Sequence, residues 1–270
     1  MSEPLRVMVI GAHPDDADED AGAATLKLVD RGARVRFVSV ACGDLGHQSM
    51  APEALAARRL LEAQASGRAL GVEDYAILGY HDCEVEATLD LRRRLTRLIR
   101  SFAPHIVMTH RTCDYHADHR AVGTAVMDAT YLLGVPHWCP DVPRPPVLPA
   151  VFFLRDSFTV PRPLRPDLLI DADPYIERNV TALLNHESQF FEWLPYDDGF
   201  ADQVPDPGDD AARRAFIVEH WLSRKVDDAA RFGNVWRERH PGTPVPTYLE
   251  AYEFSEYGRA PTPAELAWFE

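Results

Sequence analysis

The first half of the chain alternates short apolar runs with longer amphipathic segments. We predict four strands, each a short run dominated by β-branched or apolar residues, at positions 7–10, 35–40, 75–78 and 106–109. A helix is predicted over 52–71, because Pro52 marks its start and Gly71 its end. A second helix is predicted over 89–102, where apolar residues recur on one face and arginines lie opposite.

This regular alternation of strand and helix predicts the fold class. Nearly continuous apolar strands separated by helices are typical of an α/β, Rossmann-like, mostly parallel sheet with helices on both faces. In such sheets ligands bind beyond the carboxyl ends of the strands. The loops that follow the four strands are therefore the expected location of a functional site.

The second half of the chain has a different texture. A proline-rich connection covers residues 136–149, and an acidic loop that contains prolines covers 195–210. Between and after them we predict strands at 150–154 and 168–171 and helices at 174–192 and 209–224. We expect the two loops to determine substrate specificity.

The chain shows no internal repeat, and its length suits one large domain. We predict a single domain over residues 1–270, with a core at about 5–135 and a C-terminal elaboration at about 136–270.

Composition excludes several classes of function. With 46% hydrophobic residues the chain can bury a full core, whereas its net charge of −14 disfavours binding to nucleic acid or to anionic membranes. The first ten residues resemble neither a signal peptide nor a transmembrane helix, which predicts a cytoplasmic protein. We expect a neutral or cationic small-molecule substrate, unless a metal ion supplies positive charge. A homo-oligomer is compatible with the sequence.

The cysteines predict reduced thiols. Cys42, Cys83, Cys113 and Cys139 lack the CxxC spacing of a zinc ribbon and are few for the length of the chain. Three of them follow predicted strands, where thiolates could serve a metal ion. We favour the alternative that they are small buried hydrophobic residues.

The loop after the first strand concentrates groups that bind metals and transfer protons. His13 precedes a proline and therefore lies in an extended segment or a turn. Asp15 and Asp16 are neighbours in a turn, so their side chains point in different directions. One of them can ligate a metal together with His13 while the other handles a proton. The alternative is a polar turn whose aspartates cap the next helix.

The loop after the fourth strand offers a third ligand. His116 and His119 are three residues apart, so both can lie on one helical face near a helix start, one reaching a metal and the other a substrate oxygen. Asp118 is suited to hold an imidazole in one tautomer. A hydrolytic zinc site needs about three protein ligands and an open position. Paired histidines on a helix surface are the alternative.

Four separated motifs together resemble a known family. "GAHPDDAD", "CGDLGH", "GYHDCEVEATLDLRRRLTRLI" and "THRTCDYHADHRAVG" are similar, in this order, to motifs of the LmbE-like or PIG-L family of zinc-dependent N-acetylglucosaminyl deacetylases. The resemblance covers residues 7 to about 130, with a weaker match in "LLNHESQFFEW" at 183–193. Ala17 and Ala117 depart from the usual wording of the motifs but replace no expected ligand.

The resemblance assigns roles to individual residues. It implies that the zinc ligands are His13, Asp16 and His119, that Asp15 is the general base, and that His116 stabilises the oxyanion. It further implies that Asp82 and Arg59 bind the substrate, although Arg58 stands beside Arg59.

The implied activity is a metal-dependent hydrolysis. Zinc, or Fe²⁺ or another divalent ion, activates water that removes the acetyl group from an N-acetylated amino sugar or its conjugate. A zinc amidase or esterase acting on a larger conjugate and a non-catalytic sugar-binding protein are the alternatives. A dinucleotide-binding domain is disfavoured because no GxGxxG follows the first strand, and Asp15 and Asp16 would repel a pyrophosphate.

The remaining candidates have structural interpretations. We expect Asp44 and His47 to belong to a tight turn, and His186 to be a structural histidine within a helix. Core packing is the favoured role for the large aromatic side chains, with an aromatic wall for a sugar ring as the alternative. These side chains are Trp138, Phe190, Phe191 and Trp193.

Overall fold

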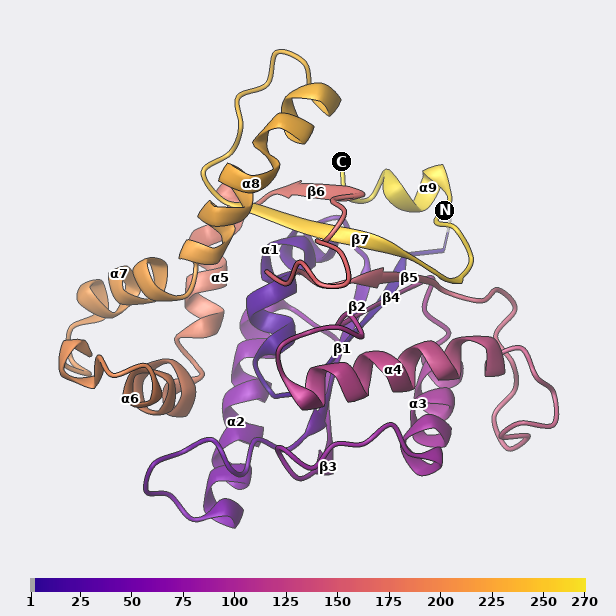
Figure 1. Cartoon of the computed structure of the whole chain (residues 1–270), viewed down its shortest axis with the longest axis horizontal. Coiled ribbons are helices and arrows are strands. Elements are labelled where there is room, and N and C mark those ends of the chain that lie inside the picture. Colours follow the sequence, from indigo (N-terminus) through magenta and orange to yellow (C-terminus); the bar gives the residue numbers. More distant parts are fainter. Residues whose placement is uncertain (1–2) are drawn as a thin grey trace.

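A seven-stranded sheet forms the centre of the computed structural model, which describes residues 3–270 (Figure 1). The strands are β1 (Arg6–Gly11), β2 (Arg34–Ala41), β3 (Asp74–Tyr80), β4 (Ile106–Thr109), β5 (Ala150–Phe153), β6 (Leu168–Asp171) and β7 (Leu249–Gly258). They lie in the order β3-β2-β1-β4-β5-β7-β6. Strands β1 to β5 pair in parallel, and β7 is antiparallel to both of its neighbours. The predicted mostly parallel α/β sheet is confirmed.

The helices lie on both faces of this sheet (Figure 1). They are α1 (Asp16–Asp30), α2 (Pro52–Leu70), α3 (Leu89–Phe102), α4 (Ala117–Leu132), α5 (Ile176–Leu183), α6 (Leu194–Asp197), α7 (Asp210–His220), α8 (Ser223–Arg239) and α9 (Pro263–Leu266). Short 3-10 turns occupy Asp173–Tyr175 and Ala201–Gln203, and a π-helical turn occupies Ser188–Trp193.

Strand β1 is apolar from Val7 to Ile10, where helices cover both of its faces. Val7 and Val9 pack in one buried cluster with residues of α1 and α2. Met8 and Ile10, which point the other way, pack with residues of α3 and α4. Successive side chains of a strand point to opposite faces, so a stretch covered on both sides is apolar at consecutive positions.

The second half of the chain departs from the prediction in several places. The single helix predicted over 174–192 is interrupted, because α5 ends at Leu183 and the π-helical turn follows. His186 therefore lies in the break between them and not within a helix. The helix predicted over 209–224 is also two helices, since α7 ends at His220 and α8 continues to Arg239. Strand β7 was not predicted.

Helix α1 depends on β7 for its shape. The helix is interrupted at Ala21, whose φ of −131° and ψ of 17° are not helical. The buried carboxylate of Glu250 accepts hydrogen bonds from the backbone N–H groups of Ala23 and Ala24, at 2.9 and 2.8 Å. Lys225 of α8 donates to the same carboxylate at 2.6 Å. Glu250 therefore replaces the helical acceptors that the interruption removes.

The proline-rich segment 136–149 is held by one buried side chain of α3. Arg100 is only 4% exposed. Its guanidinium donates, at 2.6–3.2 Å, to the carbonyl oxygens of Leu132, Leu133, Val135, Trp138, Cys139 and Val142. An irregular segment without a ladder needs such donors, because buried carbonyl groups are costly to leave unpaired.

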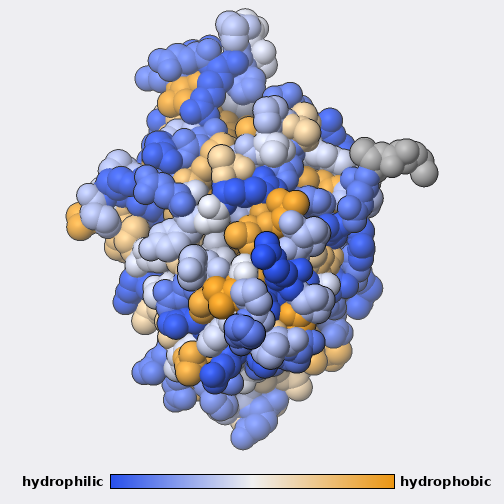
Figure 2. All heavy atoms as spheres, turned by 90° about the vertical axis from the view of Figure 1, so that its right-hand side faces the viewer, coloured by the Kyte–Doolittle hydropathy of each residue, from blue (hydrophilic) through white to orange (hydrophobic). Residues whose placement is uncertain are grey.

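Hydrophilic residues cover most of the surface shown in Figure 2, with apolar side chains in small groups between them. None of the helices between residues 3 and 270 combines the length and the apolar composition that a membrane crossing requires.

The role of Arg100 can be tested by comparing two arginines of α3. We expect Arg100→Lys to lower the free energy of unfolding by about 2–4 kcal/mol, because an ammonium group cannot reach all of these carbonyls. Arg97→Lys is the control, since Arg97 forms a surface ion pair with Asp141 and should change stability by less than about 0.5 kcal/mol. Urea unfolding measures both; equal effects would contradict the proposed role.

Candidate active site

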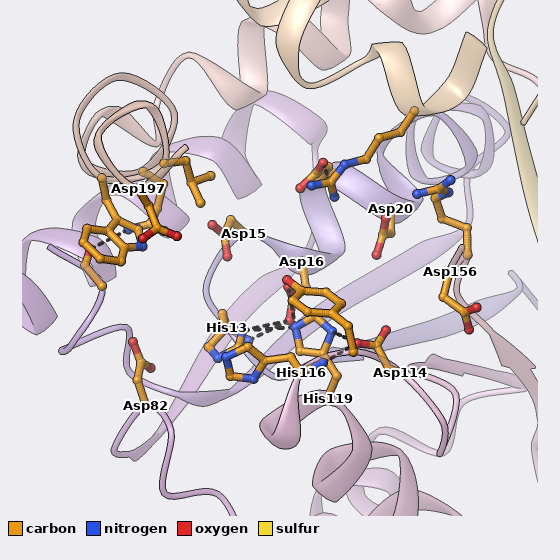
Figure 3. Close-up of a pocket in the computed structure, with 18 of the residues that line it drawn as sticks. His13, Asp15, Asp16, Asp20, Asp82, Asp114, His116, His119, Asp156 and Asp197 are labelled. Carbon is orange, nitrogen blue, oxygen red and sulfur yellow. Dashed lines mark hydrogen bonds and ion pairs between the residues drawn. The ribbon is translucent and has the colours of Figure 1, made fainter. Parts of the chain in front are cut away.

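A cavity of about 550 Å³ opens at the carboxyl edge of the parallel strands (Figure 3). The loops after β1, β3 and β4 form its floor, and residues from the second half of the chain complete its wall. The residues expected to bind a metal, transfer a proton or bind substrate line it, whereas Asp118 is not part of the lining and contacts His13. The site residues expected from the sequence that line the cavity are His13, Asp15, Asp16, Arg59, Asp82, His116 and His119.

The carboxylate of Asp16 closes the turn between β1 and α1. Its Oδ2 accepts hydrogen bonds from the backbone N–H groups of Ala12 and His13, at 2.8 and 2.7 Å. The Nε2 atom of His110 lies 3.0 Å from the same oxygen. Oδ2 is therefore occupied by the fold, whereas Oδ1 is directed at His119, 3.4 Å from its Nε2.

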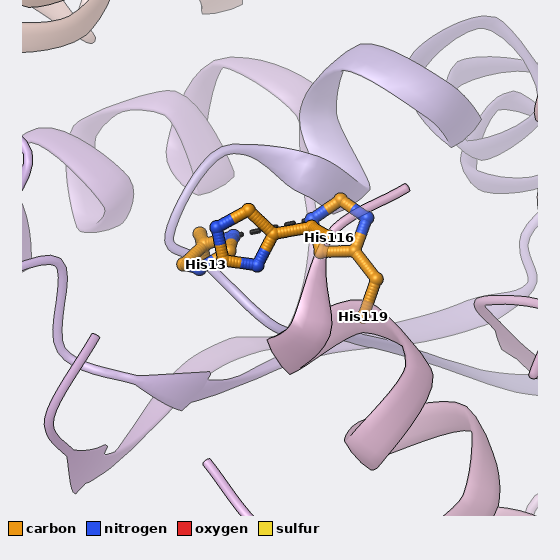
Figure 4. A group of neighbouring side chains, drawn as sticks. All are labelled: His13, His116 and His119. Carbon is orange, nitrogen blue, oxygen red and sulfur yellow. Dashed lines mark hydrogen bonds between the residues drawn. The ribbon is translucent and has the colours of Figure 1, made fainter. Parts of the chain in front are cut away.

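The imidazoles of His13 and His119 are each held on one side by a carboxylate. The Nε2 of His13 lies 3.1 Å from a carboxylate oxygen of Asp118, and the Nδ1 of His119 lies 3.0 Å from a carboxylate oxygen of Asp114. Each carboxylate occupies the outer nitrogen of its ring and leaves the inner nitrogen free. The two inner nitrogens, His13 Nδ1 and His119 Nε2, are 3.2 Å apart (Figure 4).

These three side chains fit a small tetrahedral metal ion. The Nε2 of His119 lies 3.2 Å from the Nδ1 of His13 and 3.4 Å from the Oδ1 of Asp16, and the Nδ1 of His13 lies 3.7 Å from the other oxygen of Asp16, Oδ2. Ligands bonded to zinc at about 2.0–2.1 Å in a tetrahedron lie about 3.3 Å from one another. The set of two imidazoles and one carboxylate is also typical of hydrolytic zinc sites. His13, His116 and His119 also bring ligand atoms within 4.8 Å of one another, as do Asp16, His110 and His119.

The charges around these groups favour a cation. Burial alone would lower the pKa of His13, but its contacts with Asp118 and Asp16 outweigh burial and raise the pKa to about 10. Burial likewise opposes the charged form of His119, and the carboxylates of Asp16 and Asp114 raise its pKa to about 9. Despite its burial, Asp16 has a pKa well below the usual value because His119 and His110 stabilise its charge. The surrounding carboxylates thus stabilise positive charge at this point.

Asp15 does not cap the helix that follows it. It occupies the N-cap position of α1, but its side chain accepts no hydrogen bond from the helix N–H groups. The capping alternative is therefore wrong for Asp15. Its carboxylate lies 3.0 Å from the Nη2 of Arg59, which is 2% exposed. The neighbouring Arg58 instead pairs with Glu192 and Glu62, so only Arg59 faces the cavity.

The ring of His116 is oriented by the start of α4. His116 is the N-cap residue of that helix, and its Nδ1 accepts a hydrogen bond of 3.1 Å from the backbone N–H of Asp118. The neutral ring therefore carries its proton on Nε2. Burial and the nearby His13 and His119 lower the pKa of His116, which favours this neutral form.

Asp82 has both a structural contact and a place in the cavity. Its carboxylate accepts hydrogen bonds from the backbone N–H groups of Gly43 and Leu45, at 2.8 and 3.3 Å. A carboxylate has about four acceptor positions, so two stay available to a ligand. Asp44, in turn, accepts from the backbone N–H of Asp82 at 3.0 Å. His47 contacts Glu192 at 2.8 Å, away from the cavity lining.

His110 and Asp114, which contact the proposed ligands Asp16 and His119, were not predicted from the sequence. Both belong to the loop after β4 that the sequence had already singled out, and His110 directly follows the strand. Their signal was their position, since polar side chains immediately after a parallel strand face the edge at which ligands bind. The prediction covered side chains that could bind a metal directly, but not the side chains that orient those ligands.

Only one of the two loops that were expected to determine specificity contributes to the cavity. Asp197, from the acidic loop, lines the cavity, whereas residues 136–149 contribute nothing to its lining. The second half contributes other residues that were not predicted. Among them are Arg155, Asp156 and Arg224.

The four aromatic side chains singled out in the sequence lie in different surroundings. Trp193 lines the cavity, Phe190 and Phe191 are buried in a core cluster, and Trp138 donates a hydrogen bond to Thr96.

The prediction of reduced thiols is confirmed, because all four cysteines are free. Of the three cysteines that follow strands and were expected to be buried, Cys42 and Cys113 are half-buried, whereas the expectation is wrong for Cys83, which is exposed at the cavity.

Comparison with known proteins supports the fold and the motifs. The PIG-L family, described as GlcNAc-PI de-N-acetylase, matches residues 8–130. A diacetylchitobiose deacetylase of Thermococcus kodakarensis is 30% identical over 205 residues, covering 71% of this chain and 74% of that protein. A probable N-acetyl-alpha-D-glucosaminyl L-malate deacetylase 2 of Bacillus anthracis is 26% identical, covering 76% and 92%. The N,N'-diacetylchitobiose deacetylase structure from Pyrococcus horikoshii has a TM-score of 0.73 at 23% identity, covering 94% and 84%.

Metal binding provides a direct test of the site. After dialysis against zinc, we expect His119→Ala to hold about one zinc ion per chain fewer than the wild type, because one of the three ligands at the cavity is removed. Asp15→Asn should keep the ion, since that side chain contacts Arg59 and not the three donors. Elemental analysis measures the content. Full zinc retention by His119→Ala would contradict this ligand set.

The supporting carboxylate of His119 can be tested separately. We expect Asp114→Asn to weaken zinc affinity about 10–100-fold, because the ring loses the charge that orients it. Asp197→Asn serves as the matched control on the same cavity, and its affinity should match the wild type. Competition with a chromophoric chelator gives both constants. Equal affinities for the two variants would show that Asp114 does not support the ligand.

Proposed function

Since the chain belongs to the PIG-L family of deacetylases, we propose that it hydrolyses the acetamide group of an N-acetylated amino sugar or of its conjugate. The observation that carries this proposal is that donor atoms of His13, Asp16 and His119 converge on one point. In each of these side chains, another nitrogen or oxygen atom is held by a neighbouring residue. Asp15 and His116 stand beside them in one cavity (Figure 3).

Zinc or a related divalent ion is the proposed cofactor, with His13, Asp16 and His119 as its ligands. When bound, it would polarise the acyl carbonyl and make a water molecule more acidic. The mixed nitrogen and oxygen donors also suit Fe²⁺.

Asp15 is the proposed general base. Its carboxylate is directed into the cavity and is oriented by the ion pair with Arg59 at 3.0 Å. A carboxylate in this position takes the proton of the attacking water, and the resulting carboxylic acid returns that proton to the departing nitrogen. The products are acetate and a free amine, so one water is consumed for each amide bond broken.

His116 is the proposed donor to the acyl oxygen. Because its Nδ1 accepts a backbone N–H, the Nε2–H of the neutral ring is free to donate into the cavity. A donor fixed in advance stabilises negative charge as it develops on the oxygen, and such preorganisation is usually the largest contribution to catalysis. The neutral ring acts as a hydrogen-bond donor and does not need to be protonated first.

The proposed substrate is a sugar that carries a second group. Asp82 and Arg59 offer an acceptor and donors for sugar hydroxyl groups, and Trp193 offers an apolar face to a ring. The cavity continues beyond these residues to Asp156 and Arg224, which leaves space for a conjugated group. The names of the relatives, which include diacetylchitobiose and N-acetylglucosaminyl malate, are consistent with a two-part substrate.

Acetate release tests the proposed reaction. We expect the zinc-loaded protein to release acetate from N-acetylglucosamine or diacetylchitobiose, and a chelator to abolish the release. Asp15→Asn should reduce kcat about 10²–10⁴-fold with its zinc content unchanged, because the base is lost and the ligands are not. Glu53→Gln, which changes an exposed carboxylate of α2, is the control and should match the wild type.

Two outcomes would contradict the proposal. If chelation leaves the rate unchanged, the reaction does not use the metal. If Asp15→Asn keeps the wild-type kcat, a different residue takes the proton.

A further inference from the structure

A second group of metal-binding side chains lies outside the cavity lining, at the ends of β2 and β3. Cys42 follows β2 and His81 follows β3, each by one residue, and Asp44 lies between them in space. Their ligand atoms all lie within 4.8 Å of one another. We propose that Cys42, Asp44 and His81 bind a second transition-metal ion of the zinc class, which fixes the loop that supports the catalytic site.

The backbone places Cys42 and Asp44 together. The N–H of Cys42 donates to the carbonyl oxygen of Tyr80 at 2.9 Å, which extends the pairing of β2 with β3 beyond the strands. Gly43, between the two candidate ligands, has a φ of +76° that side chains rarely adopt. A Cβ at Gly43 would also lie 2.5 Å from the Cδ of Arg59. The turn is therefore fixed by the same residues that face the cavity.

Asp44 is prepared for a ligand in the same manner as Asp16. Its side chain is 4% exposed. Oδ1 accepts the backbone N–H of Asp82 at 3.0 Å, whereas Oδ2 is directed at the Nδ1 of His81 at 2.5 Å. The side chain of His81 is 67% exposed, so its ring is free to turn and admit an ion between the two atoms.

The three donors differ in chemistry from those of a calcium or magnesium site. A thiolate, an imidazole and a carboxylate together select zinc or cobalt, whereas Mg²⁺ and Ca²⁺ prefer oxygen ligands. Three protein ligands leave one position for water. Burial and the carboxylates of Asp44 and Asp82 raise the pKa of the Cys42 thiol to about 11, so the ion must displace a proton.

An ion at this position would act on the loop 81–85, which contacts the catalytic site. The N–H groups of Cys83 and Val85 donate to the carboxylate of Asp118, at 2.7 and 3.3 Å. Asp118 in turn holds the Nε2 of His13 at 3.1 Å. The loop therefore connects His81 to a ligand of the first ion through two sets of hydrogen bonds. Fixing His81 restricts the backbone that orients Asp118.

Cobalt provides the test, because a thiolate bound to Co²⁺ gives a strong near-ultraviolet charge-transfer absorption that the sulfur-free ligands of the catalytic site cannot give. The full-length protein, freed of metal, is titrated with Co²⁺ at a pH of about 8, where displacement of the thiol proton is easier. We expect about two ions per chain and a thiolate band that saturates with one of them.

Four variants distinguish the two sites. Cys42→Ser and His81→Ala should each lose one ion and the band, and the exposed position of His81 makes the second variant safe for folding. Cys113→Ser is the matched control, since that thiol is free and half-buried like Cys42 but lies outside the ligand group and the cavity lining, and it should behave as the wild type. His13→Ala should lose the other ion and keep the band.

The proposal is independent of the catalytic assignment. It is overturned if the wild type shows no thiolate band, if the band survives in Cys42→Ser and in His81→Ala, or if the band disappears in His13→Ala. The last result would place the thiolate at the catalytic ion. Failure of acetate release has no bearing on these spectra, so the two proposals fail separately.

Discussion

The carboxylate of Asp16 holds the turn on which the whole site depends. Its Oδ2 binds the backbone N–H groups of Ala12 and His13, so the chain leaves β1 and enters α1 in one fixed path. Gly11 is necessary there, because a Cβ at that position would lie 2.8 Å from the Cβ of Asp16. The side chains of His13 and Asp15 are positioned by this turn. A single residue thus combines a structural task on one oxygen with a proposed ligand role on the other.

The two proposed histidine ligands follow the same rule as Asp16: one atom of the side chain contacts a supporting residue, and another atom faces the proposed metal position. His13 is held by Asp118 and His119 by Asp114, and each supporting carboxylate lies within a few residues of the start of α4. Charged side chains crowded into one cavity repel one another, and burial raises the pKa of Asp20 to about 8, helped by the charge of Glu19. The arginines of the cavity offset this repulsion, and the proposed cation would offset it further. The proposed metal therefore has an electrostatic role beyond its chemistry.

Much of this arrangement could be predicted from the sequence. The elements that could not be predicted depend on contacts between distant parts of the chain. The strands of the first half were visible because burial on both faces makes them continuously apolar, and the rule on carboxyl ends then indicated the loops. Strand β7 was hidden because Glu250 and Glu253 occupy buried positions in it, where they pair with Lys225 and Arg162. Such pairing depends on the tertiary structure, and no local pattern shows it.

Helix breaks were missed for a related reason. Sequence periodicity continues through His186, yet the chain leaves the helix there, with that ring 3.4 Å from the buried carboxylate of Asp18. His110 and Asp114 were missed because their partners come from other parts of the fold. The roles assigned to the ligands came from the family resemblance, whereas their supporting contacts required the coordinates.

The link between Glu250 and α1 sets an order of events during synthesis. The acceptor for Ala23 and Ala24 follows the opening motif by more than 200 positions, with separations of 227 and 226 residues between the bonded groups. Contacts between such distant positions form late, because a long loop must close before they stabilise the chain. The nascent chain can therefore begin its sheet early, while the first helix waits for the last strand. The part of α1 that follows the interruption at Ala21 is therefore completed only once β7 is present.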